Sequence, residues 1–370
     1  MTDTKSWYII ENIAEVDSPA LVVYPERIKA NIGAALAMVD NPAVLRPHVK
    51  TSKMSEVAAM LMSKGVHKFK CATIAEAEML AMAGAKDVLL AYQPVGPKIL
   101  RLLQLVKAYP ATRFSCLVDS VDNATHLNEV CAAQKSTLNV FIDLNTGMNR
   151  TGISPARAFV LFTAIRQLPA LRFAGLHAYD GHLNDKDLDT RIKKSDEAFA
   201  PVTGLAAKFQ SITNQPLTII AGGTPTFPVH ARRPGVECSP GTFVFSDWNY
   251  KQGLPDEPFD YAALVITRVI SVIDQHTVCL DLGHKSVAAE NPLPRVQFLN
   301  MPAAQPIAQS EEHLVVKLSD TASVSIGDVW YGVPVHICPT VALYEKAYTV
   351  EEGRISGHWK VIARNRFINF

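Results

Sequence analysis

The sequence has 370 residues, of which 48% are hydrophobic and 19% charged, and such a chain can bury a large core and form two domains. Its 36 Lys and Arg residues nearly balance its 35 Asp and Glu residues, so the net charge does not favour binding to nucleic acid or to an anionic membrane. A small molecule is the expected partner. The first residues are polar and no apolar run is long enough to span a bilayer, so we expect a cytoplasmic protein.

Short apolar runs alternate with helical patterns over the first two thirds of the chain. The predicted strands are 20–24, 68–72, 87–92, 113–118, 138–144, 172–178, 217–221 and 236–238. The predicted helices are 25–38, 53–63, 74–83, 97–108, 121–134, 155–167 and 187–212. One further buried strand is expected from Ala43, bounded by Pro47. This alternation indicates a parallel sheet, and its length favours a closed eight-stranded α/β barrel, (β/α)8, over an open sheet.

The pattern changes around residues 249–260, where glycine and prolines cluster among charges and predict a linker. Beyond it lie strand-length runs rich in β-branched residues, with no convincing helix between them. These runs are 261–273, 276–281, 312–318, 328–334 and 358–363. The C-terminal third is therefore predicted to be a separate β domain, and we place the barrel at 25–255 and the β domain at 256–370.

Lys50 lies where the short strand bounded by Pro47 is expected to end. An ammonium group at the rim of an apolar strand loses hydration and so more readily yields the free amine that forms Schiff bases with carbonyls. A lysine that extends its charged end to solvent, or that caps a helix, is the structural alternative at this position.

Two glycine motifs follow the last barrel strands, Gly222-Gly223-Thr224 and Gly241-Thr242. Glycines at such positions let backbone N–H groups converge on a phosphate, and Thr224 adds a hydroxyl donor. A Gly-Gly pair alone is more often a plain turn. Because phosphate sites in barrels are commonly built from two adjacent late loops, the two motifs together predict a phosphate site.

Two further side chains follow barrel strands. Arg150 ends a strand and loop passage, where a fixed cation can bind an anionic oxygen, although a surface arginine paired with Asp143 is the alternative. Tyr179 follows the strand 172–178 and can stack on a ligand or hydrogen-bond to it. An aromatic residue at a strand end also packs in a core, so both readings of Tyr179 stay open.

His336 and Cys338 form a His-x-Cys pair in the C-terminal third. In an extended segment residues i and i+2 face the same side, so the imidazole and the thiolate would converge on one point. Borderline divalent metals accept that ligand set. With two protein ligands, the open positions would go to water and substrate, as a Lewis-acid site requires.

Six motifs, in order along nearly the whole chain, resemble those of metal-activated fold-type III pyridoxal-phosphate enzymes, the D-threonine aldolase and D-serine dehydratase group. They are Pro47-His48-Val49-Lys50-Thr51, Gly147-Met148-Asn149-Arg150-Thr151-Gly152, Gly175-Leu176-His177-Ala178-Tyr179-Asp180-Gly181, Gly222-Gly223-Thr224-Pro225, Ser239-Pro240-Gly241-Thr242-Phe243 and His336-Ile337-Cys338-Pro339-Thr340. The resemblance implies a TIM-like barrel of the alanine racemase type, with residues 1–24 packing with the β domain. It also implies pyridoxal phosphate on Lys50 with Arg150 at its phenolate oxygen, Zn²⁺ or Mn²⁺ on His336 and Cys338, and a homodimer.

The resemblance divides at the metal motif, because the dehydratases carry His-x-Cys and well-known aldolases carry His-x-Asp. This chain has the thiol, while the block around Tyr179 resembles the aldolases, whose following loop histidine is not cleanly matched. Asp185 and His182 lie nearby. We predict cleavage of a D-β-hydroxy amino acid to glycine and an aldehyde, with His182 or His177 as the base. Elimination to a 2-oxo acid and ammonia is the main alternative, followed by an amino-acid racemase or a pyridoxal-phosphate-binding protein without turnover.

Overall fold

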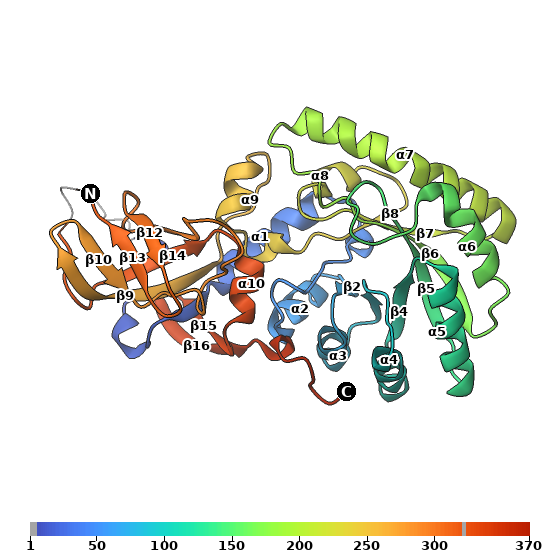
Figure 1. The fold of residues 1–370 in the computed structure, drawn as a ribbon, viewed down its shortest axis with the longest axis horizontal. Coiled ribbons are helices and arrows are strands. Elements are labelled where there is room, and N and C mark those ends of the chain that lie inside the picture. The colour runs from blue at the N-terminus through green and yellow to red at the C-terminus, as the bar shows by residue number, and fades with distance from the viewer. Residues whose placement is uncertain (1–5, 320–322) are drawn as a thin grey trace. The chain divides into compact units, whose positions relative to one another are not determined.

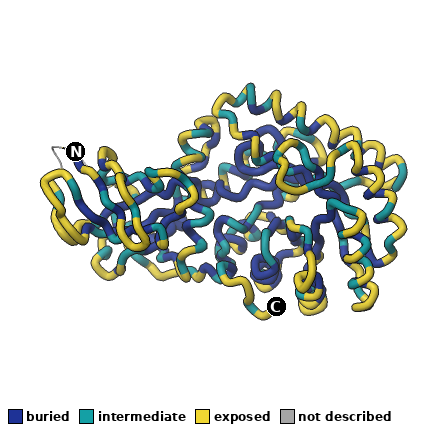
Figure 2. Tube along the Cα trace, in the orientation of Figure 1, coloured by how far each residue is buried: buried dark blue, intermediate teal, exposed yellow. Residues whose placement is uncertain are grey.

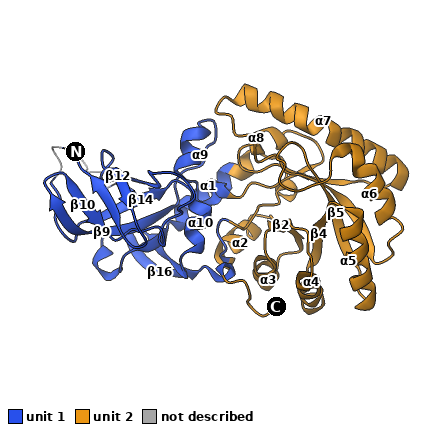
Figure 3. Cartoon of the chain, viewed as in Figure 1, with its two compact units in different colours: residues 1–34, 51–54, 242–364 blue, residues 35–50, 55–241, 365–370 orange. Residues whose placement is uncertain are grey.

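The computed structural model describes residues 6–319 and 323–370. The chain divides into two compact units, each assembled from segments that are distant in the sequence (Figure 3). The β unit comprises the described residues of 1–34, 51–54 and 242–364. The barrel unit comprises residues 35–50, 55–241 and 365–370. Within the described ranges, no helix is both long and apolar enough to cross a membrane.

The barrel unit is built on a parallel sheet of seven strands, β2 to β8, that lie side by side in sequence order (Figure 1). The strands are β2 (Lys68–Cys71), β3 (Asp87–Leu90), β4 (Arg113–Val118), β5 (Leu138–Leu144), β6 (Leu171–Ala178), β7 (Thr218–Ala221) and β8 (Val236–Cys238). Their inward-facing residues form a small core of Leu89, Leu117, Phe141 and Ile220. Each strand is joined to the next by a segment that includes a helix, the alternating βα order typical of parallel barrels.

The segment around Pro47 closes this sheet, but not as the regular eighth strand that was expected. On one side the Arg46 N–H donates to the Cys238 carbonyl of β8 at 2.8 Å, and on the other the Val49 N–H donates to the Lys70 carbonyl of β2 at 3.0 Å. Pro47 has no N–H to add to the ladder, so the pairing is reduced to isolated bridges. Lys50 follows this closing segment directly.

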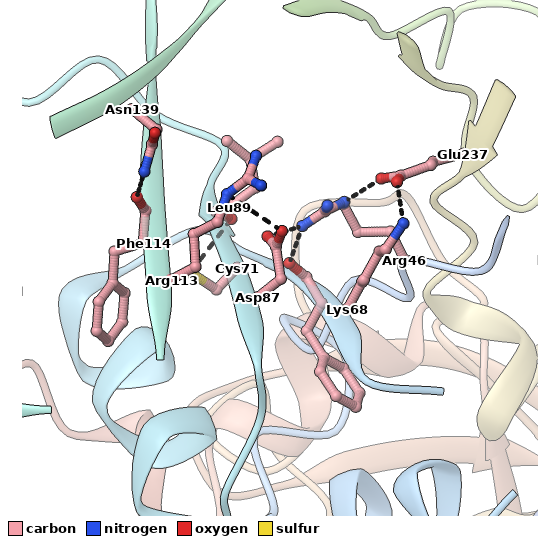
Figure 4. A network of polar contacts seen from close by, with 10 residues as sticks. Arg46, Lys68, Cys71, Asp87, Leu89, Arg113, Phe114, Asn139 and Glu237 are labelled. Carbon is pink, nitrogen blue, oxygen red and sulfur yellow. Dashed lines mark hydrogen bonds and ion pairs between the residues drawn. The ribbon is translucent and has the colours of Figure 1, made fainter. Parts of the chain in front are cut away.

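A buried ion network also holds the closing segment to the sheet (Figure 4). The Arg46 side chain is 1% exposed and pairs with Asp87 of β3 at 2.6 Å and with Glu237 of β8 at 2.7 Å. Lys68 of β2 pairs with the second oxygen of Glu237. One guanidinium therefore binds carboxylates from two strands that are far apart in the sheet order, which fixes the position of the segment leading to Lys50.

The helices of the barrel unit largely match the predicted ones. They are α2 (Ser55–Met62), α3 (Ile74–Met82), α4 (Pro97–Ala108), α5 (Val121–Ala133), α6 (Ala158–Ile165), α7 (Leu188–Thr213) and the short α8 (Phe227–His230), with 3-10 helices η2 (Pro42–Val44) and η3 (Pro155–Arg157). Thr73, Ser120 and Asp187 cap α3, α5 and α7 by accepting a backbone N–H in the first turn. Figure 2 shows that burial follows the strands, while the helices expose their outer faces.

The β unit contains a nine-stranded, mostly antiparallel sheet in which β1 lies between β9 and β15. Its strands are β1 (Ala20–Val23), β9 (Ala263–Asp274), β10 (Thr277–Leu280), β11 (Val296–Phe298), β12 (Gln305–Gln309), β13 (Leu314–Lys317), β14 (Val329–Pro334), β15 (Lys346–Glu351) and β16 (Arg354–Lys360). The helices α9 (Trp248–Gly253) and α10 (Ile337–Ala342) and the 3-10 helices η1 (Ile13–Glu15), η4 (Thr242–Val244) and η5 (Ile362–Arg364) complete the β unit, and α1 (Pro25–Ala37) contains the boundary between the units.

The expectation of a C-terminal domain without helices is wrong at α10. This helix has only six residues, too few to show a helical repeat of apolar positions. It starts directly after β14, where the buried Asp247 carboxylate accepts the Ile337 N–H at 3.1 Å. A carboxylate distant in the sequence thus accepts one of the first N–H groups of α10, so no local sequence pattern predicts where this helix starts.

Candidate active site

A hollow of about 500 Å³, continuous with solvent, opens where the barrel strands end at their carboxyl termini. Its lining includes Lys50, Arg150, His177 and Tyr179, which were all predicted from the sequence. Two ionisable residues that were not predicted as ligands or bases, Lys70 of β2 and Asp143 of β5, line it as well. Catalytic groups of barrel enzymes gather at this end of the strands.

Asp143 and His177 form the buried centre of the pocket. The register of β5 and β6 pairs the two residues, and His177 Nδ1 lies 2.7 Å from Asp143 Oδ1. Thr151 Oγ1 and Gln93 Nε2 each donate to Asp143 Oδ2 at 2.9 Å. Although burial raises the pKa of Asp143, these hydrogen bonds outweigh it and hold the pKa below its usual value. The carboxylate is thus ionised and can only accept, so Nδ1 carries the hydrogen of His177.

Lys70 extends the pair of Asp143 and His177 into an array of three residues. Its side chain is buried, and Nζ lies 3.4 Å from His177 Nε2. Burial, reinforced by the neighbouring charge of Lys50, lowers the pKa of Lys70 to about 7. Burial and Lys70 also lower the pKa of His177, against the opposing effect of Asp143. The pocket therefore holds a neutral imidazole next to an amine that changes charge near neutral pH.

Two basic side chains lie near the ring of Tyr179. Lys70 Nζ and Arg150 Cζ are each 5.2 Å from the centre of its ring. The ring also packs against the loop after β7, since a Cβ on Gly223 would lie 3.1 Å from Tyr179 Cε2. The ion pair between Arg150 and Asp143 that the sequence left open is not formed, because that carboxylate is bonded to His177, Thr151 and Gln93.

The loops after β7 and β8 are joined to each other. The Gly241 N–H donates to Thr224 Oγ1 at 3.1 Å, and the Gly222 and Gly223 amides donate to the Ala178 carbonyl and to Thr226 Oγ1. The Ser239 hydroxyl is buried and has no hydrogen-bond partner among the described residues. A buried hydroxyl without a partner fits a loop that binds an anionic oxygen. The two predicted phosphate loops therefore lie together, but the amides of Gly222, Gly223 and Gly241 are hydrogen-bonded within the loops, and the buried donor without a partner here is the Ser239 hydroxyl.

His182, the other predicted base, lies outside the pocket lining. It is exposed, and a Cβ on Gly147 would lie 2.7 Å from its Nε2, which places the ring over the loop that leads to Arg150. Asp185 pairs with Lys194 at 2.6 Å. Of the two predicted bases, the structure brings only His177 into the pocket with Lys50.

In the β unit, His336 and Cys338 do not lie on an extended segment, and that expectation is wrong. His336 is the N-cap residue of α10, and Cys338 lies in its first turn. Burial lowers the pKa of His336, but the interactions of its ring with Cys338 and Glu290 outweigh burial and raise the pKa to about 9. Cys338 Sγ lies 3.0 Å from Thr51 Oγ1 and 3.5 Å from Thr242 Oγ1.

The contacts of His336 fit a metal ligand. Its Nδ1 bonds to a carboxylate oxygen of Glu290, as metal-binding histidines commonly do with the nitrogen that faces away from the metal. This arrangement leaves Nε2 of His336 and the sulfur of Cys338 as the two atoms that could hold a metal. No group of three or more His, Cys, Asp or Glu side chains suited to a metal occurs in residues 6–319 and 323–370, so the pair would need water or substrate to complete the coordination.

Comparison with known proteins decides the family. Residues 23–245 match the alanine racemase N-terminal domain, and residues 262–350 match a serine dehydratase domain. A D-threonine aldolase from Arthrobacter sp is 30% identical over 364 residues, which cover 95% of this chain and 94% of that protein. The chain belongs to the D-threonine aldolase and D-serine dehydratase-like family.

Other relatives in this family match over the same length. A 3-hydroxy-D-aspartate aldolase from Paracoccus denitrificans (strain Pd 1222) is 27% identical over 367 residues, covering 95% of this chain and 93% of that protein. The crystal structure of D-threonine aldolase from Filomicrobium marinum superposes with a TM-score of 0.88 at 28% identity, covering 97% of this chain and 98% of that one. The fold predicted for this aldolase and dehydratase-like family, an alanine racemase-type barrel with a second, mostly antiparallel domain, is confirmed.

Sequence reasoning missed Lys70, although a signal was present. Residues 68–72 were predicted as a barrel strand, and a lysine near the carboxyl end of such a strand is rarely buried without a functional role. The partners of Lys70 come from β6 and β5, more than a hundred residues away for His177. The array of Lys70, His177 and Asp143 therefore becomes visible only in the folded barrel.

Proposed function

We propose that this protein is a pyridoxal-phosphate- and metal-dependent lyase that cleaves D-β-hydroxy amino acids to glycine and an aldehyde. The observation that carries the proposal is the Lys50 pocket at the carboxyl ends of the barrel strands, in a chain related to aldolases over nearly its full length. We further propose a cytoplasmic homodimer with a D-amino acid as its small-molecule substrate.

Lys50 would bind the aldehyde carbon of pyridoxal phosphate through its amine. Arg150 would bind the phenolate oxygen, and Tyr179 would lie beside the ring. The phosphate would be bound by the loops after β7 and β8, which supply Gly222, Gly223, Thr224, Ser239, Gly241 and Thr242. When bound, pyridoxal phosphate supplies an electron sink for the bond that breaks at the α-carbon.

His336 and Cys338 would hold the divalent metal, Zn²⁺ or Mn²⁺, with Glu290 orienting the imidazole. When bound, such a metal supplies Lewis-acid polarisation of an oxygen ligand. A base then removes the proton of the β-hydroxyl, and the bond between the α- and β-carbons breaks. His177 and His182 are the proposed bases.

Elimination of water is the second candidate function. Two observations favour it: the match of residues 262–350 to a serine dehydratase domain, and the thiol at position 338, where the resemblance gives known aldolases a carboxylate. Thiolate and carboxylate are both anionic, so exchanging one for the other affects metal preference more directly than the bond that breaks. The thiol is therefore weak support for the dehydratase.

The decisive experiment is product analysis with D-threonine in the presence of pyridoxal phosphate and Zn²⁺ or Mn²⁺. The aldolase yields acetaldehyde and glycine, whereas the dehydratase yields 2-oxobutanoate and ammonia. Formation of L-allo-threonine, the product of inversion at the α-carbon alone, without cleavage would identify a racemase. Protein that binds pyridoxal phosphate but changes none of these substrates would refute the lyase.

A further inference from the structure

Lys70 is a second amine in the pocket of Lys50, and the proposed function gives it no role. It lies on β2 with 2% of its surface exposed, yet its side chain lines the hollow. A lysine buried this deeply loses hydration that no partner here fully restores. A residue of this kind at the carboxyl end of a barrel strand is a functional residue more often than a packing residue.

The array behind Lys70 fixes its orientation. Because Asp143 is an acceptor, the hydrogen of His177 lies on Nδ1, and the lone pair of Nε2 faces Lys70. Lys70 therefore donates one N–H to Nε2. The only acceptor atom of His177 is thus occupied by Lys70, and the amine is the end of the array that can face a ligand.

We infer that Lys70 is a proton-transferring amine of this pocket, oriented by His177 and Asp143, that takes the β-hydroxyl proton and returns a proton to the α-carbon of glycine. The inference rests on the proposed aldol cleavage and refines it, since His177 becomes a positioning residue instead of the base. The step balances: the amine becomes an ammonium when the hydroxyl becomes the aldehyde oxygen. The amine is neutral again when the α-carbon receives its hydrogen.

The charges around the amine suit both halves of this step. A base that must accept and then release a proton works best when its pKa lies near the working pH, and burial lowers the pKa of Lys70 to about 7. The groups that face it from the surrounding elements are Lys50, Asp143, Arg150, His177, Tyr179 and Asp180. The two carboxylates oppose the two cations, so the charge state of Lys70 is sensitive to what binds beside it.

The test uses the purified holoenzyme with Lys70→Met and a matched control, Lys64→Met, at an exposed lysine of the same unit. In protein carrying ¹³C at the lysine ε-carbon, one NMR signal should titrate with a midpoint near pH 7 and should be absent only from Lys70→Met. With D-threonine, Lys70→Met should lose about a hundredfold or more in kcat, with little change in KM, while Lys64→Met stays at the wild-type rate.

A Lys70→Ala variant separates a reacting amine from a structural one. Ethylamine added to it should restore part of the turnover, because a small amine can enter the space left by the side chain, and a packing role would not respond. Turnover of Lys70→Met within threefold of wild type, or no lysine signal titrating below pH 9, would overturn the inference. Wild-type protein that releases no acetaldehyde from D-threonine would instead refute the proposed function, and this control is read before the variants.

Discussion

Replacing Arg46 with methionine tests whether the ion network closes the barrel. Breaking a buried ion pair costs about 3–5 kcal/mol when the remaining charge is left without a partner. Here Asp87 would keep Arg113 at 3.6 Å and Glu237 would keep Lys68, and both carboxylate side chains are 11–14% exposed. We therefore expect a loss of about 2–3 kcal/mol in the free energy of unfolding, below that full cost.

The chain offers a control and a way to localise the loss. Lys68→Met removes a partner of Glu237 whose own side chain is 35% exposed, so it should cost less than about 1 kcal/mol. The four tryptophans, at positions 7, 248, 330 and 359, all lie in the β unit. In urea, Arg46→Met should shift the far-UV circular dichroism transition more than the tryptophan fluorescence transition. Equal stability of Arg46→Met and wild type, within about 0.5 kcal/mol, would refute the reasoning.

Four further outcomes are expected. Lys50→Ala should abolish the visible absorbance of bound pyridoxal phosphate, and a borohydride-reducible linkage surviving in the variant would contradict the assignment. EDTA should remove turnover but leave that absorbance, and full activity after dialysis against chelator would exclude the metal. Gly223→Ala should weaken cofactor binding about tenfold by forcing Tyr179 to move, whereas Gly204→Ala, with open space around it, should not; fluorescence titration compares the two. Lys70→Met should be more stable than wild type near pH 7, by an excess that disappears toward the unfolded pKa of about 10.4, because the unfolded chain binds the extra proton over this range.

Most of the barrel could be predicted because its strands and helices carry local signals. The limits of β4, β5 and β8 were predicted to the residue, and each matches a short run of mostly buried residues. The segment around Pro47 could not be predicted in detail. Its pairing depends on the backbone groups that β8 and β2 leave free at the two edges of the sheet. An isolated bridge produces no repeating pattern of apolar residues in the sequence.

In the β unit the same reasoning missed β11, β12 and β15. These strands have three to six residues, and β12 is partly exposed along its length, so neither a buried run nor a clean alternation marks it. The His-x-Cys motif was found because both ligands lie two positions apart in the sequence. Its geometry was misjudged, because the direction of the two side chains is set by the helix α10 that begins between them.

The charges of the Lys50 pocket explain how Lys70 can be neutral there and still take part in proton transfer. Lys50, Lys70 and Arg150 line the pocket together with Asp143, whose carboxylate is already hydrogen-bonded to His177. A third positive charge would add repulsion in a site of low dielectric, and burial together with the neighbouring charge of Lys50 lowers the pKa of Lys70 to about 7. The carboxylate of a bound substrate stabilises the ammonium that Lys70 becomes when it takes the β-hydroxyl proton. Lys70 is neutral again once the α-carbon of glycine has received its hydrogen.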